Sequence, residues 1–354
     1  MNLKIKIKII SKKILTIVIG CLIGLILGEL VLRIYNPLPS RIQGNHICLE
    51  AGIKRDIVLQ EGFQHPGLDN EYIYSTNSLG FRGPEPDDSN FKIYTVGGST
   101  TECSLLADDK TWSSQLLKRL NGHEGKQVWL NNAGLDGSST YGHQVLLEEH
   151  LIKLKPEMVM FLVGVNDLFQ TSYSTGDDFF QKIPKYSWRK WMNRSELVSF
   201  LLNFYRSQVT KSRKVGHFGI EEIPELSKSD IENRRIKHRN AQPEYVTRLN
   251  KLIETCRNAG IEPVLITQPI RIVSSSQKTA DIDIYNETTK LVALASNVQL
   301  VDLAGSLETS SDYFYDEMHY TINGADRVAE IIFTHLKLKN SNQGYDNAGE
   351  SIGD

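Results

Sequence analysis

Residues 92–99 read Lys92-Ile93-Tyr94-Thr95-Val96-Gly97-Gly98-Ser99. The first five positions form a short run rich in apolar and β-branched side chains, which is typical of a strand, and the two glycines that follow interrupt it. Apolar residues then recur at helical spacing from Thr111 to Leu120. The stretch therefore predicts a strand, a tight turn and a helix.

The same alternation continues to the end of the chain. Further strands are predicted over 127–130, 158–163, 263–267 and 298–303, and further helices over 140–154, 243–258 and 323–336. Strands that alternate with helices form a largely parallel sheet with helices on both faces. The predicted fold class is therefore α/β, and in such a sheet the sites lie at the carboxyl ends of the strands.

A serine, a histidine and a carboxylate lie in positions that suit nucleophilic catalysis. Ser99 follows the first strand and precedes a helix, whose N-terminus favours developing negative charge. A serine hydroxyl needs a neighbouring base, and the base needs a third group that fixes its tautomer. Asp316-Glu317-Met318-His319 supplies both on one turn. Taken singly, Ser99 is also explained as an ordinary helix N-cap, and the D-x-x-H segment as a capped helix start.

Two other strand ends carry hydrogen-bond donors. Asn131-Asn132-Ala133-Gly134 follows the second strand, and Gly164-Val165-Asn166-Asp167 follows the third. The tetrahedral intermediate of ester cleavage carries an oxyanion that needs preorganised donors. Gly134 offers an unobstructed backbone N–H and Asn166 a side-chain amide, although a loop glycine and an Asx-turn are their more ordinary roles.

Together these segments resemble the four sequence blocks of the SGNH hydrolase superfamily, also called GDSL-type esterases. The matching segments are Gly97-Gly98-Ser99-Thr100-Thr101, Asn132-Ala133-Gly134-x-x-Gly137, Gly164-Val165-Asn166-Asp167 and Asp316-x-x-His319. Upstream, the segment from Asn77 to Glu85 resembles one found in membrane-anchored bacterial members. The first block departs from the family pattern, since Gly98 stands where G-D-S-L has an aspartate.

The resemblance implies a three-layer flavodoxin-like fold and a triad of Ser99, His319 and Asp316. It implies an oxyanion hole formed by the N–H of Ser99, the N–H of Gly134 and the amide of Asn166. It also implies that the enzyme uses no metal and no organic cofactor. An α/β-hydrolase is disfavoured, because Ser99 does not lie in a G-x-S-x-G segment and the acid precedes the histidine so closely.

The N-terminal segment predicts a membrane anchor. Lysines precede an apolar run that begins at Ile14, and no acidic residue occurs before Glu29, which is a positive-inside pattern. If the helix continues to Pro37, the apolar span is about 20 residues, roughly the thickness of a hydrocarbon core. We therefore expect the rest of the chain to lie outside the cytoplasm. A cleaved signal peptide, or a lipoprotein signal at Cys21, is the alternative.

Composition disfavours several other classes of protein. The formal net charge of −2 gives no global reason to expect a nucleic-acid partner. None of the cysteines lies in a C-x-x-C pair or at metal-ligand spacing with a histidine, so neither a zinc module nor a redox module is predicted. The expected partners are an ester substrate and the membrane, and the sequence leaves the oligomeric state open.

The expected organisation begins with a basic N-terminus over 1–13, a transmembrane helix over 14–35 and a stalk with loop-rich sequence over 36–90. The hydrolase domain follows over 91–338, with an insertion over 170–240, and a disordered tail is expected over 339–354. The basic and aromatic part of the insertion predicts a helix from Ser195 to Val209 that packs its apolar side chains on the domain. The Trp-rich loop before that helix is expected to contact sugar rings or anionic headgroups.

The function predicted from the sequence is hydrolysis of a carboxylic ester, on a cell-envelope substrate such as an O-acetylated glycan. One alternative is an O-acyltransferase that uses the same triad but passes the acyl group to a sugar hydroxyl. Another is a non-catalytic envelope binding or scaffold protein. An added acceptor distinguishes the first alternative, and labelling by a fluorophosphonate distinguishes the second.

Overall fold

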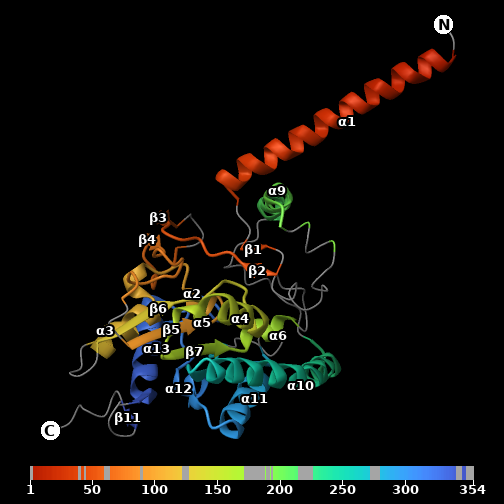
Figure 1. Ribbon diagram of the computed structural model, residues 1–354. Helices are drawn as coiled ribbons and strands as arrows, with labels where there is room; N and C mark the ends of the chain where they lie inside the picture. Colours follow the sequence, from red (N-terminus) through yellow and green to blue (C-terminus); the bar gives the residue numbers. More distant parts are fainter. Residues whose placement is uncertain are drawn as a thin grey trace. The chain divides into compact units, whose positions relative to one another are not determined.

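The computed structural model describes residues 3–38, 41–43, 45–59, 64–87, 91–121, 127–170, 188, 192, 194–213, 226–271, 280–339 and 345–347. The chain divides into two compact units. One comprises Met1–Cys48 and Ile183–Val215, and the other comprises Leu49–Lys182 and Gly216–Asp354. We call them the anchor unit and the sheet unit, and each is described by itself (Figure 1).

The sheet unit is built on a five-stranded sheet with the order β6-β5-β7-β8-β9. Its strands are β5 (Phe91–Val96), β6 (Val128–Asn132), β7 (Met158–Val163), β8 (Glu262–Thr267) and β9 (Gln299–Val301). Every neighbouring pair is parallel. Because β5 lies between β6 and β7, the loops after these three strands leave the same edge side by side. This strand order is that of the flavodoxin-like folds, so the predicted fold class is confirmed.

Helices cover both faces of this sheet. On one face, α3 (Trp112–Asn121), α12 (Leu303–Ser306) and α13 (Ile322–His335) share one buried cluster with the strands. On the other face lie α4 (Thr140–Leu146), α10 (Lys228–Asn258) and α11 (Ile282–Ala295), of which α10 contacts both of the others. The architecture is therefore three-layered, as predicted.

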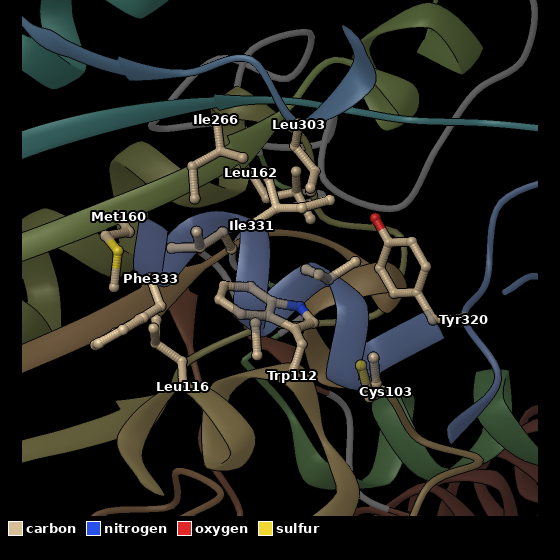
Figure 2. Packing of buried hydrophobic residues seen from close by; sticks show 14 of the residues in the cluster. Cys103, Trp112, Leu116, Met160, Leu162, Ile266, Leu303, Tyr320, Ile331 and Phe333 are labelled. Atoms are coloured by element: carbon tan, nitrogen blue, oxygen red, sulfur yellow. The ribbon is translucent and has the colours of Figure 1, made fainter. Parts of the chain in front are cut away.

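The core reaches directly under the loop that follows β5. Trp112 is fully buried in the cluster, and Figure 2 shows its indole ring among side chains of the sheet and of α13, including Leu162 and Ile331. Its Nε1–H donates to the Thr100 carbonyl at 3.1 Å. The segment that carries Ser99 therefore rests on the hydrophobic core.

Two helices differ from their predictions. The helix expected from Pro243 begins at Lys228, so Pro243 lies inside it. The Ser227 side chain caps its first turn, and the ion pair between Arg234 and the buried Asp281 ties its first half to the N-terminus of α11. These residues are polar, so no apolar periodicity revealed the helix. The helix expected over 140–154 is α4, a π-helical turn η2 (Leu147–Leu151) and α5 (Ile152–Leu154).

Part of the expected stalk is a β-hairpin of the sheet unit. Strand β3 (Lys54–Val58) pairs antiparallel with β4 (Glu71–Ser75), and Tyr72 joins the core cluster. The sheet unit accordingly begins at Leu49. Flanking turn-forming residues hid these short strands in the sequence. Near the C-terminus, β10 (Lys337–Lys339) pairs with β11 (Tyr345–Asn347), and β11 lies inside the segment expected to be a disordered tail.

The anchor unit contains α1 (Leu3–Ile34), the short strands β1 (Ile42–Gln43) and β2 (His46–Ile47), and α9 (Glu196–Arg213). Within α1, Lys12–Ile34 is long enough and apolar enough to cross a membrane, with a mean hydropathy of 2.6. The helix predicted over 195–209 is present as α9, but Leu201, Phe204 and Tyr205 are exposed. Their packing on the hydrolase domain stays a prediction. Most of the Trp-rich loop before α9 lies outside the described residues.

Candidate active site

The loop after β5 forms the first part of the site. Ser99 is the first residue of the short helix α2 (Ser99–Glu102), directly after Gly97 and Gly98. A side chain at Gly98 would overlap the Asn166 amide. Glycine at this position therefore lets the loop after β7 approach the serine, and an aspartate would not fit the arrangement found here.

His319 and Asp316 come from the far end of the chain and meet Ser99 at this edge. His319 Nε2 lies 2.8 Å from Ser99 Oγ, and His319 Nδ1 lies 2.7 Å from Asp316 Oδ2. Asp316 Oδ1 accepts the backbone N–H groups of Met318 at 2.8 Å and of His319 at 2.7 Å. The turn thus holds its own carboxylate against the imidazole. The structure brings the predicted serine, histidine and aspartate together.

The groups around the Asp316 carboxyl stabilise its charged form. Burial alone would raise the pKa of the Asp316 carboxyl, but the hydrogen bond and charge of His319, with the two backbone N–H groups, lower that pKa below its usual value. The carboxylate is therefore ionised at neutral pH. Tyr315 stacks on His319 with ring centroids 5.5 Å apart and an interplanar angle of 8°, which further restricts the ring.

Two hydrogen-bond donors face the space beside Ser99. Asn166 lies in the first turn of α6 (Val165–Gln170), directly after β7. Its Nδ2 donates to the Ser138 carbonyl at 2.8 Å, and since an amide nitrogen carries two hydrogens, the second is left for a ligand. The N–H of Ser99 is the first of helix α2 and has no acceptor within the helix.

Gly134 differs from its prediction. Its N–H, expected to be unobstructed, donates to Asn132 Oδ1 at 2.8 Å, and Asn132 Nδ2 donates to the Thr101 carbonyl at 2.5 Å. A side chain at position 134 would overlap the backbone of Thr101 and Glu102. The observed contribution of Gly134 is therefore close packing of its loop against α2, with its N–H used inside that loop.

A buried ion pair that sequence reasoning missed joins the loops after β6 and β7. Asp167 accepts the Thr140 N–H at 3.2 Å and the Thr140 hydroxyl, and its side chain, 1% exposed, pairs with Arg248 of α10 at 3.1 Å. Arg248 also stacks on Tyr141, with its guanidinium carbon 4.2 Å from the ring centroid. The pair fixes the chain next to Ser138, whose carbonyl holds Asn166. Arg248 lies far away in sequence and carries no local signal of this role.

A second buried cation, Arg82, holds the turn that follows α2. The guanidinium uses all of its N–H donors, and its side chain is 4% exposed. The acceptors are the carbonyls of Glu102 at 2.7 Å, Cys103 at 2.8 Å and Leu106 at 2.8 Å, and the carboxylate of Asp108 in η1 (Asp108–Lys110). The Arg82 backbone also pairs in both directions with Asn132, at 3.1 and 2.8 Å. Arg82 therefore connects the turn that follows α2 to the end of β6.

A small hollow opens beside Ser99. It is lined by Ser99, Thr100, Cys103, Leu105, Leu106, Tyr315, His319 and Tyr320. Burial raises the pKa of the Cys103 thiol to about 12, so this thiol stays neutral and the wall beside it is largely apolar. Among the described residues, no group of three or more His, Cys, Asp or Glu side chains is placed to hold a metal ion.

Comparison with known proteins relates the chain to one family. Residues 95–327 match the family model of the GDSL-like lipases and acylhydrolases. Similar solved structures include an alpha/beta hydrolase from the metagenome of Lake Arreo, Spain, with 14% identity, a TM-score of 0.44 and coverage of 68% of this chain and 93% of that one. A catalytic mutant of an acetylxylan esterase from Geobacillus stearothermophilus has 15% identity, a TM-score of 0.44 and coverage of 71% and 97%. No curated protein matches the sequence.

We predict that Arg82→Lys slows ester cleavage. A lysine keeps the charge but has three N–H donors in place of five, so it cannot hold all four acceptors, which are the carbonyls of Glu102, Cys103 and Leu106 and the carboxylate of Asp108. A shift of the nucleophile turn by about 1 Å is expected to lower kcat/KM about 10²-fold. Initial rates with an activated ester measure this. Arg55→Lys is the matched control, because Arg55 pairs with Glu50 at 2.8 Å on the surface. A folded Arg82→Lys protein with an unchanged rate would contradict the positioning role.

Proposed function

Because the chain belongs to the GDSL-like lipase/acylhydrolase family and is an ester-hydrolysing enzyme, we propose that Ser99 is its nucleophile, His319 its general base and Asp316 the group that orients the histidine. The observation that carries this proposal is the unbroken hydrogen-bonded chain from Ser99 Oγ through both nitrogens of His319 to Asp316 Oδ2. That chain has the geometry by which a serine is activated in acyl transfer.

In the proposed reaction, Ser99 Oγ attacks the ester carbonyl while its proton passes to His319 Nε2. The resulting oxyanion lies between the Ser99 N–H and the free amide hydrogen of Asn166. His319 then returns its proton to the departing alcohol, which leaves an acyl ester on Ser99. A water molecule, deprotonated by the same imidazole, attacks this ester, and the carboxylic acid and the free serine result.

The residues divide into two groups in their expected mutant kinetics. Ser99→Ala and His319→Ala should each abolish nearly all activity, and the double mutant should lose little more, because both changes remove the same step. Asp316→Asn should lower kcat on the order of 10⁴-fold, since an amide favours the wrong tautomer of the histidine. Asn166→Ala should lower kcat only about 10²–10³-fold, because it removes one oxyanion donor.

Ester hydrolysis by purified full-length protein measures these effects, with melting curves to show that each variant is folded. A fluorophosphonate should label the wild type rapidly, Asn166→Ala slowly and Ser99→Ala not at all. If folded Ser99→Ala hydrolysed esters at the wild-type rate, the proposed mechanism would be wrong.

For the substrate, we propose a short acyl group, such as the acetyl group of an O-acetylated glycan of the cell envelope. The hollow beside Ser99 supports this, because it is small and Leu105, Leu106 and Tyr315 close it with apolar surface. We propose hydrolysis in preference to acyl transfer to a sugar, because the family is one of lipases and acylhydrolases. An acceptor sugar that outcompetes water for the acyl-enzyme would reverse this preference.

We predict that activated acetyl esters are better substrates than octanoyl esters of the same alcohol, by about 10-fold or more in kcat/KM, because excess methylenes have no pocket to enter. Leu105 lines the hollow and is only partly buried. Leu105→Ala should therefore shift the preference toward longer acyl chains. Leu294→Ala is the control, since that leucine is 81% exposed on α11. A wild-type preference for octanoate would contradict the short-acyl proposal.

For the location, we propose that α1 spans a membrane with its basic end in the cytoplasm and that the sheet unit lies outside. The apolar length of Lys12–Ile34 supports the span, and the lysines before it support the orientation. A C-terminal fusion to a phosphatase that is active only outside the cytoplasm is expected to be active. A fusion placed directly after Lys13 is the inactive control, and cytoplasmic activity of a C-terminal reporter would contradict the orientation.

A further inference from the structure

Helix α9 has its polar side facing inward and its apolar side facing out. Glu196, Ser199 and Asn203 recur at helical spacing, and each makes an inward contact or is shielded from solvent. Leu201, Leu202, Phe204 and Tyr205 lie on the other side and are between 43% and 67% exposed. A surface helix in water normally shows the opposite arrangement. The outward side of α9 therefore needs an apolar environment.

The inward side of α9 is fixed to the outer end of α1 and to the chain that follows it. Glu196 accepts hydrogen bonds from Asn36 Nδ2 and Gln43 Nε2, both at 2.6 Å. Asn203 Nδ2 donates to the Leu38 carbonyl at 3.1 Å. These contacts leave α9 little freedom to turn its leucines and aromatic rings toward α1.

Glu29 of α1 caps the N-terminus of α9. Its carboxylate accepts the Ser195 hydroxyl at 2.7 Å and the backbone N–H groups of Glu196 at 3.2 Å and Leu197 at 3.0 Å. Arg33 of α1 donates to the same carboxylate at 2.9 Å. A carboxylate near the end of an apolar span is costly unless its oxygens are satisfied, and the first N–H groups of a helix favour a negative charge. These contacts explain why an acidic residue lies in the apolar segment: Glu29 connects α1 to α9.

The apolar side of α9 adjoins an apolar surface of the same kind. Most apolar side chains of α1 from Ile14 to Ile34 are exposed, and a methyl group of Leu197 in the first turn of α9 would lie 3.8 Å from a Cβ built on Gly28. Figure 1 shows α9 viewed along its axis beside the end of α1, so the two helices cross and do not run side by side. A helix that crosses the end of a membrane span in this way lies along the membrane surface.

We propose that the side of α9 formed by Leu201, Leu202, Phe204 and Tyr205 is buried in the outer interfacial layer of the bilayer that α1 spans. The proposal rests on the proposed membrane anchoring of α1. The ligand is the acyl chains and glycerol region of the lipids, because leucines and aromatic rings are the side chains that enter this layer. Glu29 sets the depth, since it fixes the first turn of α9 to one level of α1.

The test uses the full-length protein in lipid nanodiscs. A polarity-sensitive fluorophore is attached to single cysteines at Leu201→Cys or Phe204→Cys, in a Cys21→Ser and Cys48→Ser background, because Cys103 and Cys256 are buried. The lipids carry a doxyl quencher on the acyl chain near the headgroup. Both labels should lose about half of their fluorescence or more, because interfacial helices bury their apolar face ~5–10 Å deep. A label at Asn203→Cys, on the opposite side of α9, is the matched control and should be quenched less.

A label on the natural Cys21, in a Cys48→Ser background and in lipids with the doxyl group at the middle of the acyl chain, separates the two proposals, because Cys21 lies near the middle of Lys12–Ile34. If the Cys21 label is quenched and the labels at positions 201 and 204 are not, α1 is in the membrane and the inference about α9 is wrong. If the Cys21 label is not quenched, the anchoring itself is wrong and the inference falls with it. Glu29→Gln should weaken quenching at position 201 and leave quenching at Cys21 unchanged, and a loss at both positions would contradict the role of Glu29.

Discussion

The candidate site depends on the buried guanidinium of Arg82. A cation taken out of water is destabilising unless its donors are paired, and here every N–H meets an acceptor in the turn from Glu102 to Asp108. Cys103 in that turn has a left-handed backbone with φ of 53°. Without the guanidinium, the carbonyls of Glu102, Cys103 and Leu106 would lie close together with no donor between them. Because the Arg82 backbone is also bonded to Asn132, one residue fixes both the end of α2 and the end of β6.

With this turn held in place, the loops after β5, β6 and β7 pack with their backbones in close contact at the carboxyl edge of the sheet. Gly98 makes room for the Asn166 amide, and Gly134 makes room for the backbone of α2. The ion pair of Asp167 and Arg248 then connects the loop after β7 with the loop after β6. A rigid edge of this kind suits acyl transfer, because donors that are already in place need no reorganisation when charge develops. The geometry of the candidate site is therefore a property of loop packing, and the sheet supplies the common edge on which the loops meet.

The sequence predicted what depends on local pattern and failed where partners lie far apart. All five strands of the sheet, the positions of Ser99, Asp316 and His319 at strand ends and turns, and the three-layer fold follow from periodicity and from motif order. Arg82 and Arg248 were missed, because a buried arginine is recognised only by its acceptors, which come from other segments. The N–H of Gly134 was expected to be unobstructed, and only the rotamer of Asn132 shows that it is bonded. The early start of α10 was hidden by polar residues whose partner, Asp281, lies in another helix.

The same physical device appears at Asp316 and at Glu29, with different consequences. In both, a carboxylate accepts two successive backbone N–H groups as well as side-chain donors. For Asp316 the N–H groups come from its own turn and the side chain is His319. For Glu29 the N–H groups come from the start of α9 and the side chains are Ser195 and Arg33. At Asp316 the N–H groups come from the same turn, so the arrangement orients a side chain within a site. At Glu29 they come from another helix, so the arrangement joins two elements. An acidic residue in an apolar span, which by composition alone weakens the prediction of a membrane helix, is then the residue that ties that helix to the structure outside it.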